Sequence, residues 1–246
     1  MELPSEVIRM IMENLNNKQR HSINRVCMLW KYLVATFKYI PRNLKEFEES
    51  FEPEICLQIF QKTIFSYEEN YNKLTHLNLE YNYIGKEGIQ YLAKSLESNS
   101  NLTYLNLYRN HIGKEGAQCL AKSLESNSSL TYLNLGANFI GTEGAQYLAE
   151  SLESNSSLIY LNLSYNSIGN ECAQHLAKSL KSNSSLTYLN LEYNCIGKEG
   201  TQYLAKSLEF NSSLIYLNLY DNSIGNEGTQ YLAILLKLNS NLKIEY

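Results

Sequence analysis

An unbroken tandem repeat constrains the fold of this chain more than any other feature of its sequence. The pattern Leu-x-x-Leu-x-Leu-x-x-Asn-x-Ile-Gly begins at Leu74, Leu102, Leu130, Leu158, Leu186 and Leu214, and a truncated seventh unit starts at Leu242. The spacing between consecutive starts is the same throughout. A unit this short cannot bury an apolar core alone, so neighbouring units must stack. We therefore expect residues 74–246 to form one solenoid.

Each unit is expected to contain a short strand, a turn and a helix. In the first unit Leu77 and Leu79 alternate with exposed residues, as in a strand with one buried edge. Asn82 suits the turn, because its side-chain amide can satisfy backbone groups there. A helix is expected from about Glu87, with an apolar stripe at i, i+3, i+4 and i+7 made by Ile89, Leu92, Ala93 and Leu96. Three residues of this helix are expected to face water: Lys94, Ser95 and Glu97.

These units resemble the ribonuclease-inhibitor type of leucine-rich repeat, in which every unit has a full helix. The resemblance covers about two thirds of the chain. It implies an α/β horseshoe, with parallel β-strands on the concave side and helices on the convex side.

Residues 1–40 have a different pattern, that of two short helices. Pro4 stands where a helix would start. The opening Leu-Pro-x-Glu at residues 3–6 and the closing Val-Cys-x-x-Trp-x-x-Leu at residues 26–33 resemble an F-box. In that family the small all-α domain docks on the Skp adaptor of cullin-based ubiquitin ligases, and the repeats that follow it capture the substrate. The residues that the resemblance places against the adaptor are Leu3, Pro4, Val7, Ile8, Ile11, Leu15, Val26, Cys27 and Trp30.

An alternative interpretation is that residues 1–40 form only an N-terminal cap for the horseshoe. Residues 41–73 are expected to link the head to the repeats and to include a cap helix. Its apolar stripe, just ahead of the first strand, consists of Cys56, Ile59, Phe60, Ile64 and Tyr67.

Charge and cysteine content exclude several function classes. Residues 1–45 hold eight Lys or Arg against three Glu, a net charge of +5, and the remainder is −9. An acidic repeat region disfavours nucleic acid as its ligand, and no apolar run is long enough to span a membrane.

Five cysteines without C-x-x-C spacing favour free thiols in a reducing compartment. We expect the protein to act in the cytoplasm, the nucleus or both, either of its own cell or of a host cell. The Asn-x-Ser/Thr sequons at Asn127, Asn155, Asn183 and Asn211 are read as a by-product of the repeat.

Two rows of identical side chains are expected to run along the concave face. One is a tyrosine ladder, Tyr104, Tyr132, Tyr160, Tyr188 and Tyr216, which begins at His76. The other is an asparagine row, Asn78, Asn106, Asn134, Asn162, Asn190 and Asn218. Stacked identical residues stabilise a sheet, and exposed tyrosines also anchor partners. The ladder is therefore equally interpretable as scaffold or as binding site.

Positions that vary among the units directly after each strand are better candidates for a specific site. With the tyrosine ladder, they complete the predicted substrate-binding surface: Tyr81, Tyr108, Arg109, His111, Tyr165, Glu192, Tyr193, Tyr220 and Asp221. The small pair Gly136 and Ala137 in the middle is expected to leave room for a protruding side chain of the partner.

The last helix has an apolar sequence where the others are polar. Its apolar residues are expected either to pack under the tail, residues 242–246, or to mediate self-association through Ile234, Leu235 and Leu238, with Phe210 beside them. A terminal unit normally presents a polar face to water.

The sequence contains no recognisable catalytic constellation, metal-ligand spacing or cofactor motif, so we expect a non-catalytic binding protein with no cofactor and no metal. The F-box resemblance implies a substrate-recognition subunit of a Skp–cullin–F-box ubiquitin ligase, with an unknown protein substrate. The alternative is a repeat sensor or inhibitor of a protein ligand, in which the head is only a cap.

Overall fold

The structure is a computed structural model that describes residues 75–82 and 84–246. The predicted adaptor-facing residues from Leu3 to Trp30 lie outside the described residues. So do the linker and cap helix of residues 41–73, and Leu74.

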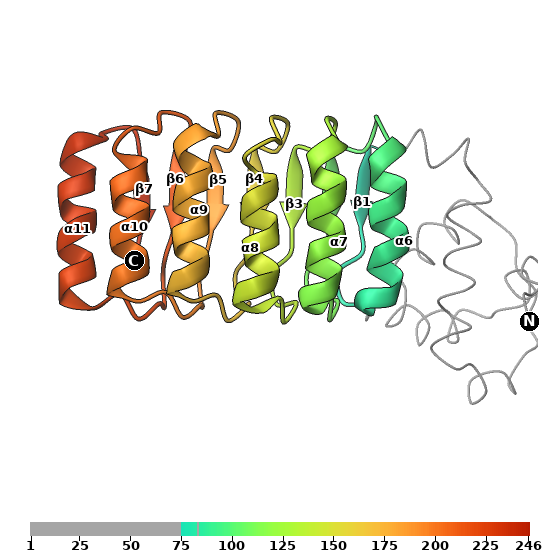
Figure 1. Cartoon of the computed structure of the whole chain (residues 1–246), viewed down its shortest axis with the longest axis horizontal. Helices are drawn as coiled ribbons and strands as arrows, with labels where there is room; N and C mark the ends of the chain where they lie inside the picture. The colour runs from blue at the N-terminus through green and yellow to red at the C-terminus, as the bar shows by residue number, and fades with distance from the viewer. Residues whose placement is uncertain (1–74, 83) are drawn as a thin grey trace, which may run out of the picture.

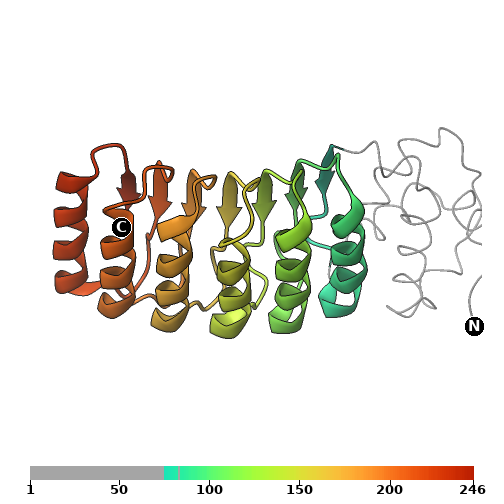
Figure 2. The same cartoon turned by 45° about the horizontal axis from the view of Figure 1, so that its top comes forward.

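Strands and helices alternate along the described chain (Figures 1 and 2). The strands are β1 (His76–Asn78), β2 (Tyr104–Asn106), β3 (Tyr132–Asn134), β4 (Tyr160–Asn162), β5 (Tyr188–Asn190), β6 (Tyr216–Asn218) and β7 (Lys243–Glu245). The helices are α6 (Gly85–Ser98), α7 (Gly113–Ser126), α8 (Gly141–Ser151), α9 (Asn170–Ser182), α10 (Lys198–Leu208) and α11 (Gly225–Leu238). Because the strands are so short, the solenoid depends on stacking of units rather than on long strands.

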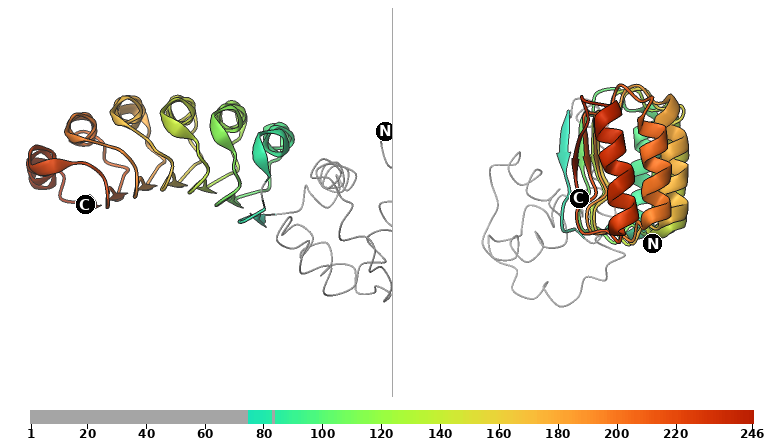
Figure 3. Two further views of the ribbon diagram at one scale, coloured as in Figure 1. Left: turned by 90° about the horizontal axis from the view of Figure 1, so that it is seen from below. Right: turned by 90° about the vertical axis from the view of Figure 1, so that its left-hand side faces the viewer.

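The seven strands form one parallel sheet in chain order, β1 to β7. Equivalent residues pair from unit to unit: Tyr104 is opposite Tyr132, and Leu105 is opposite Leu133. Figure 3 shows the helices on the outer side of a shallow arc and the strands on its inner side. The predicted α/β horseshoe is therefore confirmed, and β7 adds a seventh strand to its sheet.

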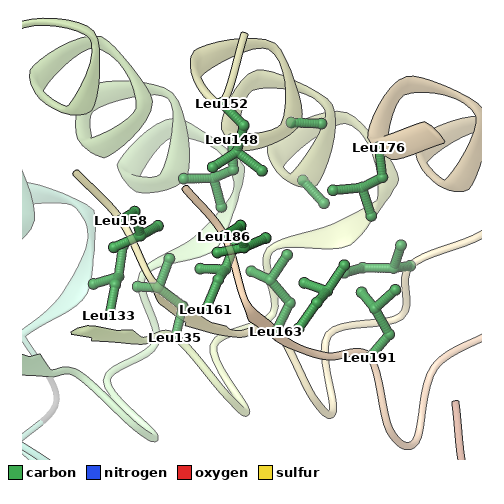
Figure 4. Close-up of a cluster of buried hydrophobic side chains, with 14 of the residues drawn as sticks. Leu133, Leu135, Leu148, Leu152, Leu158, Leu161, Leu163, Leu176, Leu186 and Leu191 are labelled. Atoms are coloured by element: carbon green, nitrogen blue, oxygen red, sulfur yellow. The ribbon is translucent and has the colours of Figure 1, made fainter. Parts of the chain in front are cut away.

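The core lies between the sheet and the helices. Leucines from β3, β4 and α8 converge there with those of neighbouring units (Figure 4), and Leu133, Leu161 and Leu148 are at most 1% exposed. The apolar stripe predicted for the first helix is buried as expected. Since burial of one such side chain contributes about 1.5–3 kcal/mol, a row of them holds each unit to the next.

Two local predictions for the first helix were wrong. Helix α6 begins at Gly85, whose φ is +64°, rather than near Glu87. Ser95 is buried rather than facing water, and its hydroxyl donates to the Tyr91 carbonyl oxygen at 3.0 Å. A small residue with an internal hydrogen bond fits a flank of the helix that a neighbouring helix covers.

Buried asparagines connect the units at both ends of each helix. Before the helices, Asn166 donates through Nδ2 to the Leu135 carbonyl oxygen of the preceding unit at 2.9 Å. After the helices, Asn155 donates in the same way to the Leu124 carbonyl oxygen at 2.8 Å. The second set includes all four sequon asparagines, which are at most 6% exposed. The sequons are therefore structural positions of the repeat, since each asparagine amide is already hydrogen-bonded to backbone.

Candidate protein-binding surface on the strand side

The tyrosine ladder is continuous along the sheet. Its five rings are parallel to within 14° and their centres are 4.1–4.4 Å apart, and the His76 ring stacks on Tyr104 at 5.5 Å. All five tyrosines are half-buried. The ladder therefore contributes to the sheet through ring stacking, and its half-buried side chains remain partly accessible to a partner.

Close packing raises the pKa of three ladder tyrosines, Tyr104, Tyr160 and Tyr216. Burial, followed by the neighbouring Tyr132, raises the pKa of Tyr104 to about 12. Burial and the flanking tyrosines also raise the pKa of Tyr160 far above its usual range. For Tyr216, burial and a hydrogen bond to Glu245 raise the pKa in the same direction. The hydroxyl groups of these three tyrosines therefore stay uncharged to a higher pH than that of an isolated tyrosine.

The asparagine row beside the ladder belongs to the scaffold. Asn106, Asn162, Asn190 and Asn218 are buried, although the sequence suggested exposed positions. Each asparagine of the row accepts a hydrogen bond from the backbone N–H two residues later, as Asn162 does from Ser164 at 2.8 Å. This local turn hydrogen bond holds the side chain against the backbone. The expectation of exposure was therefore wrong for these four asparagines, whereas Asn134 is half-buried and Asn78 of the first strand is exposed as expected.

The turns after the strands present the variable side chains to solvent. The residue before the turn asparagine has a left-handed backbone in each of the first six turns, with φ between +50° and +60°: Tyr81, Arg109, Ala137, Tyr165, Tyr193 and Asp221. The residue after the asparagine shares this conformation in three of them, as His111, Phe139 and Ser167. Such a conformation is uncommon outside glycine. The turn asparagine compensates, because its Nδ2 donates to carbonyl groups of the turn, as Asn166 does to Leu163 and Ser164 at 3.1 and 3.0 Å.

An aromatic and cationic cluster lies at the N-terminal end of this surface. Tyr81 and Tyr108 meet edge to face, with ring centres 5.6 Å apart. The Arg109 guanidinium carbon lies 5.3 Å from the Tyr81 ring centre and 5.6 Å from that of Tyr108. In the next turns His111 contacts Phe139 edge to face at 5.2 Å. The structure therefore brings together Tyr81, Tyr108 and Arg109, while the ring of His111 contacts the following unit.

A second aromatic cluster, with acidic neighbours, lies towards the C-terminal end. Tyr165 and Tyr193 are stacked at 4.3 Å, and Tyr193 meets Tyr220 edge to face at 6.0 Å. The neighbouring Tyr165, burial and the Asp221 carboxylate, in that order, raise the pKa of Tyr193 to about 12. Glu192 adjoins this cluster in sequence and accepts a hydrogen bond from Asn218 Nδ2 at 3.4 Å. This part of the surface combines exposed aromatic rings with negative charge.

The predicted opening at Gly136 and Ala137 is closed. Gly136 is buried, and a Cβ atom placed on it would lie 2.8 Å from Tyr108 Cδ2 and 2.9 Å from Ser164 Oγ. The side chains of the two neighbouring turns therefore fill the space that the glycine leaves. This expectation was wrong because it considered one unit at a time.

Three exposed apolar side chains were missing from the predicted surface. Phe139 is 70% exposed in its turn, and Ile159 and Ile215 are 45% and 52% exposed beside the ladder. For Ile159 and Ile215 the sequence contained a signal, a break in the repeat. Isoleucine stands there at the position that is threonine in other units, as Thr103, Thr131 and Thr187.

The apolar helix at the C-terminal end is only partly exposed. Ile234 and Leu238 are 53% and 62% exposed, and Phe210, one repeat before Leu238, is 77% exposed. Leu235 is fully buried, so its assignment to a self-association surface was wrong. It shares the stripe of α11 that faces the core with the buried Leu232, one helical turn earlier.

The described part of the chain offers neither a membrane-spanning helix nor a metal site. No helix in residues 75–82 and 84–246 has the length and apolar character to cross a membrane. Within the same residues no group of three or more His, Cys, Asp or Glu could hold a metal ion. What the surface presents is aromatic area, hydrogen-bonding groups and charge.

Comparison with known proteins identifies the family. The leucine-rich-repeat model matches six segments that together cover more than half of the chain: residues 72–93, 98–121, 126–149, 154–177, 182–205 and 210–233. The chain belongs to the leucine-rich-repeat family. A model of the F-box domain matches residues 1–41, which confirms the F-box ahead of the repeats. Such an architecture is typical of non-catalytic adaptor and receptor proteins.

Two solved structures are similar to this F-box and leucine-rich-repeat protein. The C-terminal domain of tropomodulin from Caenorhabditis elegans is 19% identical with a TM-score of 0.52, over 62% of this chain and 93% of that chain. Actin-binding site 2 of leiomodin-1 is also 19% identical with a TM-score of 0.44, over 74% of this chain and 90% of that chain. The tropomodulin likeness supports the repeat fold alone. A search of curated proteins gives no match.

Proposed function

We propose that this protein is the substrate-recognition subunit of a Skp–cullin–F-box ubiquitin ligase. The F-box binds the Skp adaptor and through it a cullin, and the strand-side surface of the repeats binds a protein substrate. The observation that carries the proposal is the F-box match over residues 1–41 followed by the repeat matches from residue 72. In this arrangement one part of the chain connects to the ligase and the other selects what is modified.

The charge distribution supports separate partners for the two parts. The head, residues 1–45, has a net charge of +5 and the remainder −9. A basic head suits an acidic adaptor, because complementary charge speeds association and disfavours wrong partners. We assign adaptor contact to the F-box positions given above, with Leu3, Pro4 and Trp30 as its anchors.

The strand-side surface supports a protein as the ligand of the repeats. Tyrosine and arginine are the residue types most enriched in binding hot spots, and both are exposed on the turns. The helix side carries the ion pairs of the described residues, for example Lys178 with Glu153 at 2.8 Å. Such exposed pairs contribute little, so we place substrate contact on the strand side.

The cysteines support a reducing compartment. Cys119, Cys172 and Cys195 are free thiols in the described structure, as is usual for proteins of the cytoplasm and nucleus. We therefore place the protein where cullin-based ligases act.

Co-elution with the Skp adaptor tests the proposal. The purified full chain is mixed with the adaptor and run on size exclusion, beside a variant with Leu3→Ala, Pro4→Ala and Trp30→Ala. The matched control is Ser5→Ala, at the variable position of Leu-Pro-x-Glu. We expect co-elution for the unchanged chain and the control and its loss in the triple variant. No complex with a folded head would contradict the proposal and favour a repeat sensor or inhibitor.

A further inference from the structure

Two tyrosine pairs on the strand-side turns have the same geometry four repeats apart. Tyr81 and Tyr108 meet at 5.6 Å with their ring planes at 68°. Tyr193 and Tyr220 occupy the same positions in the fifth and sixth repeats, and meet at 6.0 Å and 73°. The two pairs are therefore two copies of one local arrangement on one surface.

The residue after the second tyrosine distinguishes the two pairs. It is Arg109 in the first and Asp221 in the second, and both have a left-handed backbone. A glutamate precedes the first tyrosine in both copies, as Glu80 and Glu192. The second pair differs in two respects: a carboxylate replaces the cation, and Tyr165 of the preceding repeat stacks on Tyr193 at 4.3 Å.

The first pair shows what this arrangement of rings can hold. The Arg109 guanidinium lies over both rings, 5.3 and 5.6 Å from their centres. These are the cation–π contacts found among the described residues, and Arg109 is the single arginine in residues 75–246. A guanidinium over the face of a tyrosine is attracted by the negative face of the ring. The first pair is therefore occupied by a group of its own chain.

The second pair has no such occupant in the described structure. Tyr193 is 37% exposed and Tyr220 is 53% exposed. Neither Asp221 nor Glu192 takes part in an ion pair among the described residues. The exposed Lys243 of β7 stands opposite Tyr216 of the ladder in the strand register. Two carboxylates therefore adjoin an exposed aromatic pair that holds no cation among the described residues, with Tyr165 stacked on Tyr193 from the preceding repeat.

We propose that Tyr193, Tyr220 and Asp221 bind an arginine side chain of the protein substrate. The guanidinium takes the place over the two rings that Arg109 has in the first pair, and the Asp221 carboxylate meets its charge. Arginine fits better than lysine, because its planar group stacks on aromatic faces and is more weakly hydrated. The inference rests on the proposed role of the repeats as the substrate-binding surface, and it narrows the substrate to a protein with an accessible arginine.

Peptide titration of the full chain tests this site directly. The probe is a peptide of glycine and serine, whose side chains carry no charge, with one central arginine. The matched probes carry lysine or citrulline there, and citrulline preserves size while removing the charge. Binding is followed by NMR of the labelled tyrosine rings, assigned with single-site variants. We expect the arginine peptide to shift the Tyr193 and Tyr220 signals and to bind about tenfold more tightly than the citrulline peptide, which corresponds to about 1.4 kcal/mol.

Substitutions at Asp221 separate recognition from folding. Asp221→Arg introduces the residue that the second repeat already has at this position, so the fold accommodates it, and the new guanidinium should fill the site and abolish peptide binding. Asp221→Asn should weaken binding several-fold, and Tyr203→Ala, on the helix side, should leave it unchanged. Equal binding of the arginine and citrulline peptides, or unchanged binding by Asp221→Arg, would overturn the proposal. The titration contains no adaptor, so its outcome is independent of the F-box experiment.

Discussion

Asn166 Oδ1 accepts a hydrogen bond from the backbone N–H of Asn138, the equivalent residue of the preceding unit, at 2.9 Å. The Asn166 side chain is fully buried, and its Nδ2 donates to carbonyl oxygens of both units. One side chain thereby joins two turns and supports the left-handed residues that carry the candidate binding groups. The consensus asparagine is thus the link between repeat architecture and the shape of the surface.

Replacing this asparagine should destabilise the solenoid. We expect Asn166→Ala to lower the free energy of unfolding by about 2–4 kcal/mol, because it leaves several buried backbone groups without partners. Urea denaturation followed by circular dichroism measures the change. Ser156→Ala, at an exposed loop position, is the control and should change stability by less than about 0.5 kcal/mol. Equal stability of the two variants would contradict the linking role of Asn166.

Close approach of neighbouring helices should make Gly116 intolerant of a larger residue. A Cβ atom there would lie 2.5 Å from Ile112 Cγ2 and 2.6 Å from Ile89 Cγ2. Overpacking of this kind costs about 1–3 kcal/mol, which outweighs the better helix propensity of alanine, about 1 kcal/mol at most. Gly116→Ala should therefore lower the thermal midpoint, while Gln118→Ala, exposed on the same helix, should not. A raised midpoint for Gly116→Ala would show that the two isoleucines can move apart.

The protonated tyrosines should make stability decline at high pH. The folded-state pKa values of Tyr104 and Tyr193 are about 12, against an ordinary value of 10.0. The unfolded chain therefore loses these protons first, so their contribution is complete below about pH 10 and is lost between about pH 10 and 12. Unfolding curves over this range, with tyrosinate absorbance recorded in parallel, measure both effects. Titration of all the tyrosines near pH 10 in the folded protein would refute the closely packed ladder.

The apolar end of the solenoid should promote self-association. Phe210 and Leu238 lie at equivalent positions of adjacent repeats, and Ile234 is one helical turn before Leu238. All three are more than half exposed, so a second copy would remove them from water. We expect sedimentation velocity to show a dimer at high concentration, and a Phe210→Ser, Leu238→Ser variant to be monomeric. A strictly monomeric unchanged chain would count against this surface.

The sequence predicted the repeat fold well because two periodicities coincide in every unit. Leu77 and Leu79 alternate as in a strand, while Leu92 and Leu96 recur at helical spacing, and both patterns return at the same places in each following unit. Stacking leaves little freedom once the unit is known. The buried stripe and the parallel register followed from this argument directly.

The candidate surface was less predictable because its contacts join different positions of neighbouring units. Tyr81 meets Tyr108 of the next unit, and Tyr108 in turn covers Gly136 of the unit after that. The contact between Tyr81 and Tyr108 joins different positions of the repeat, so a comparison of equivalent positions does not reveal it. The contact between Tyr108 and Gly136 fills the space beside the glycine, and the small size of glycine alone does not reveal it. Likewise, only packing distinguishes the buried Leu235 from the exposed Ile234 beside it.

The most direct test of the account is whether one chain couples a ligase to a substrate. Ubiquitin-modified proteins are quantified in eukaryotic cells that express the unchanged chain, a Trp30→Ala variant, a Tyr193→Ala, Tyr220→Ala variant, or the control Tyr203→Ala on the helix side. The account predicts a set of proteins whose ubiquitination rises with the unchanged chain and the control, and falls with either of the other variants. Ubiquitination that does not depend on Trp30 and on the strand-side tyrosines would contradict it.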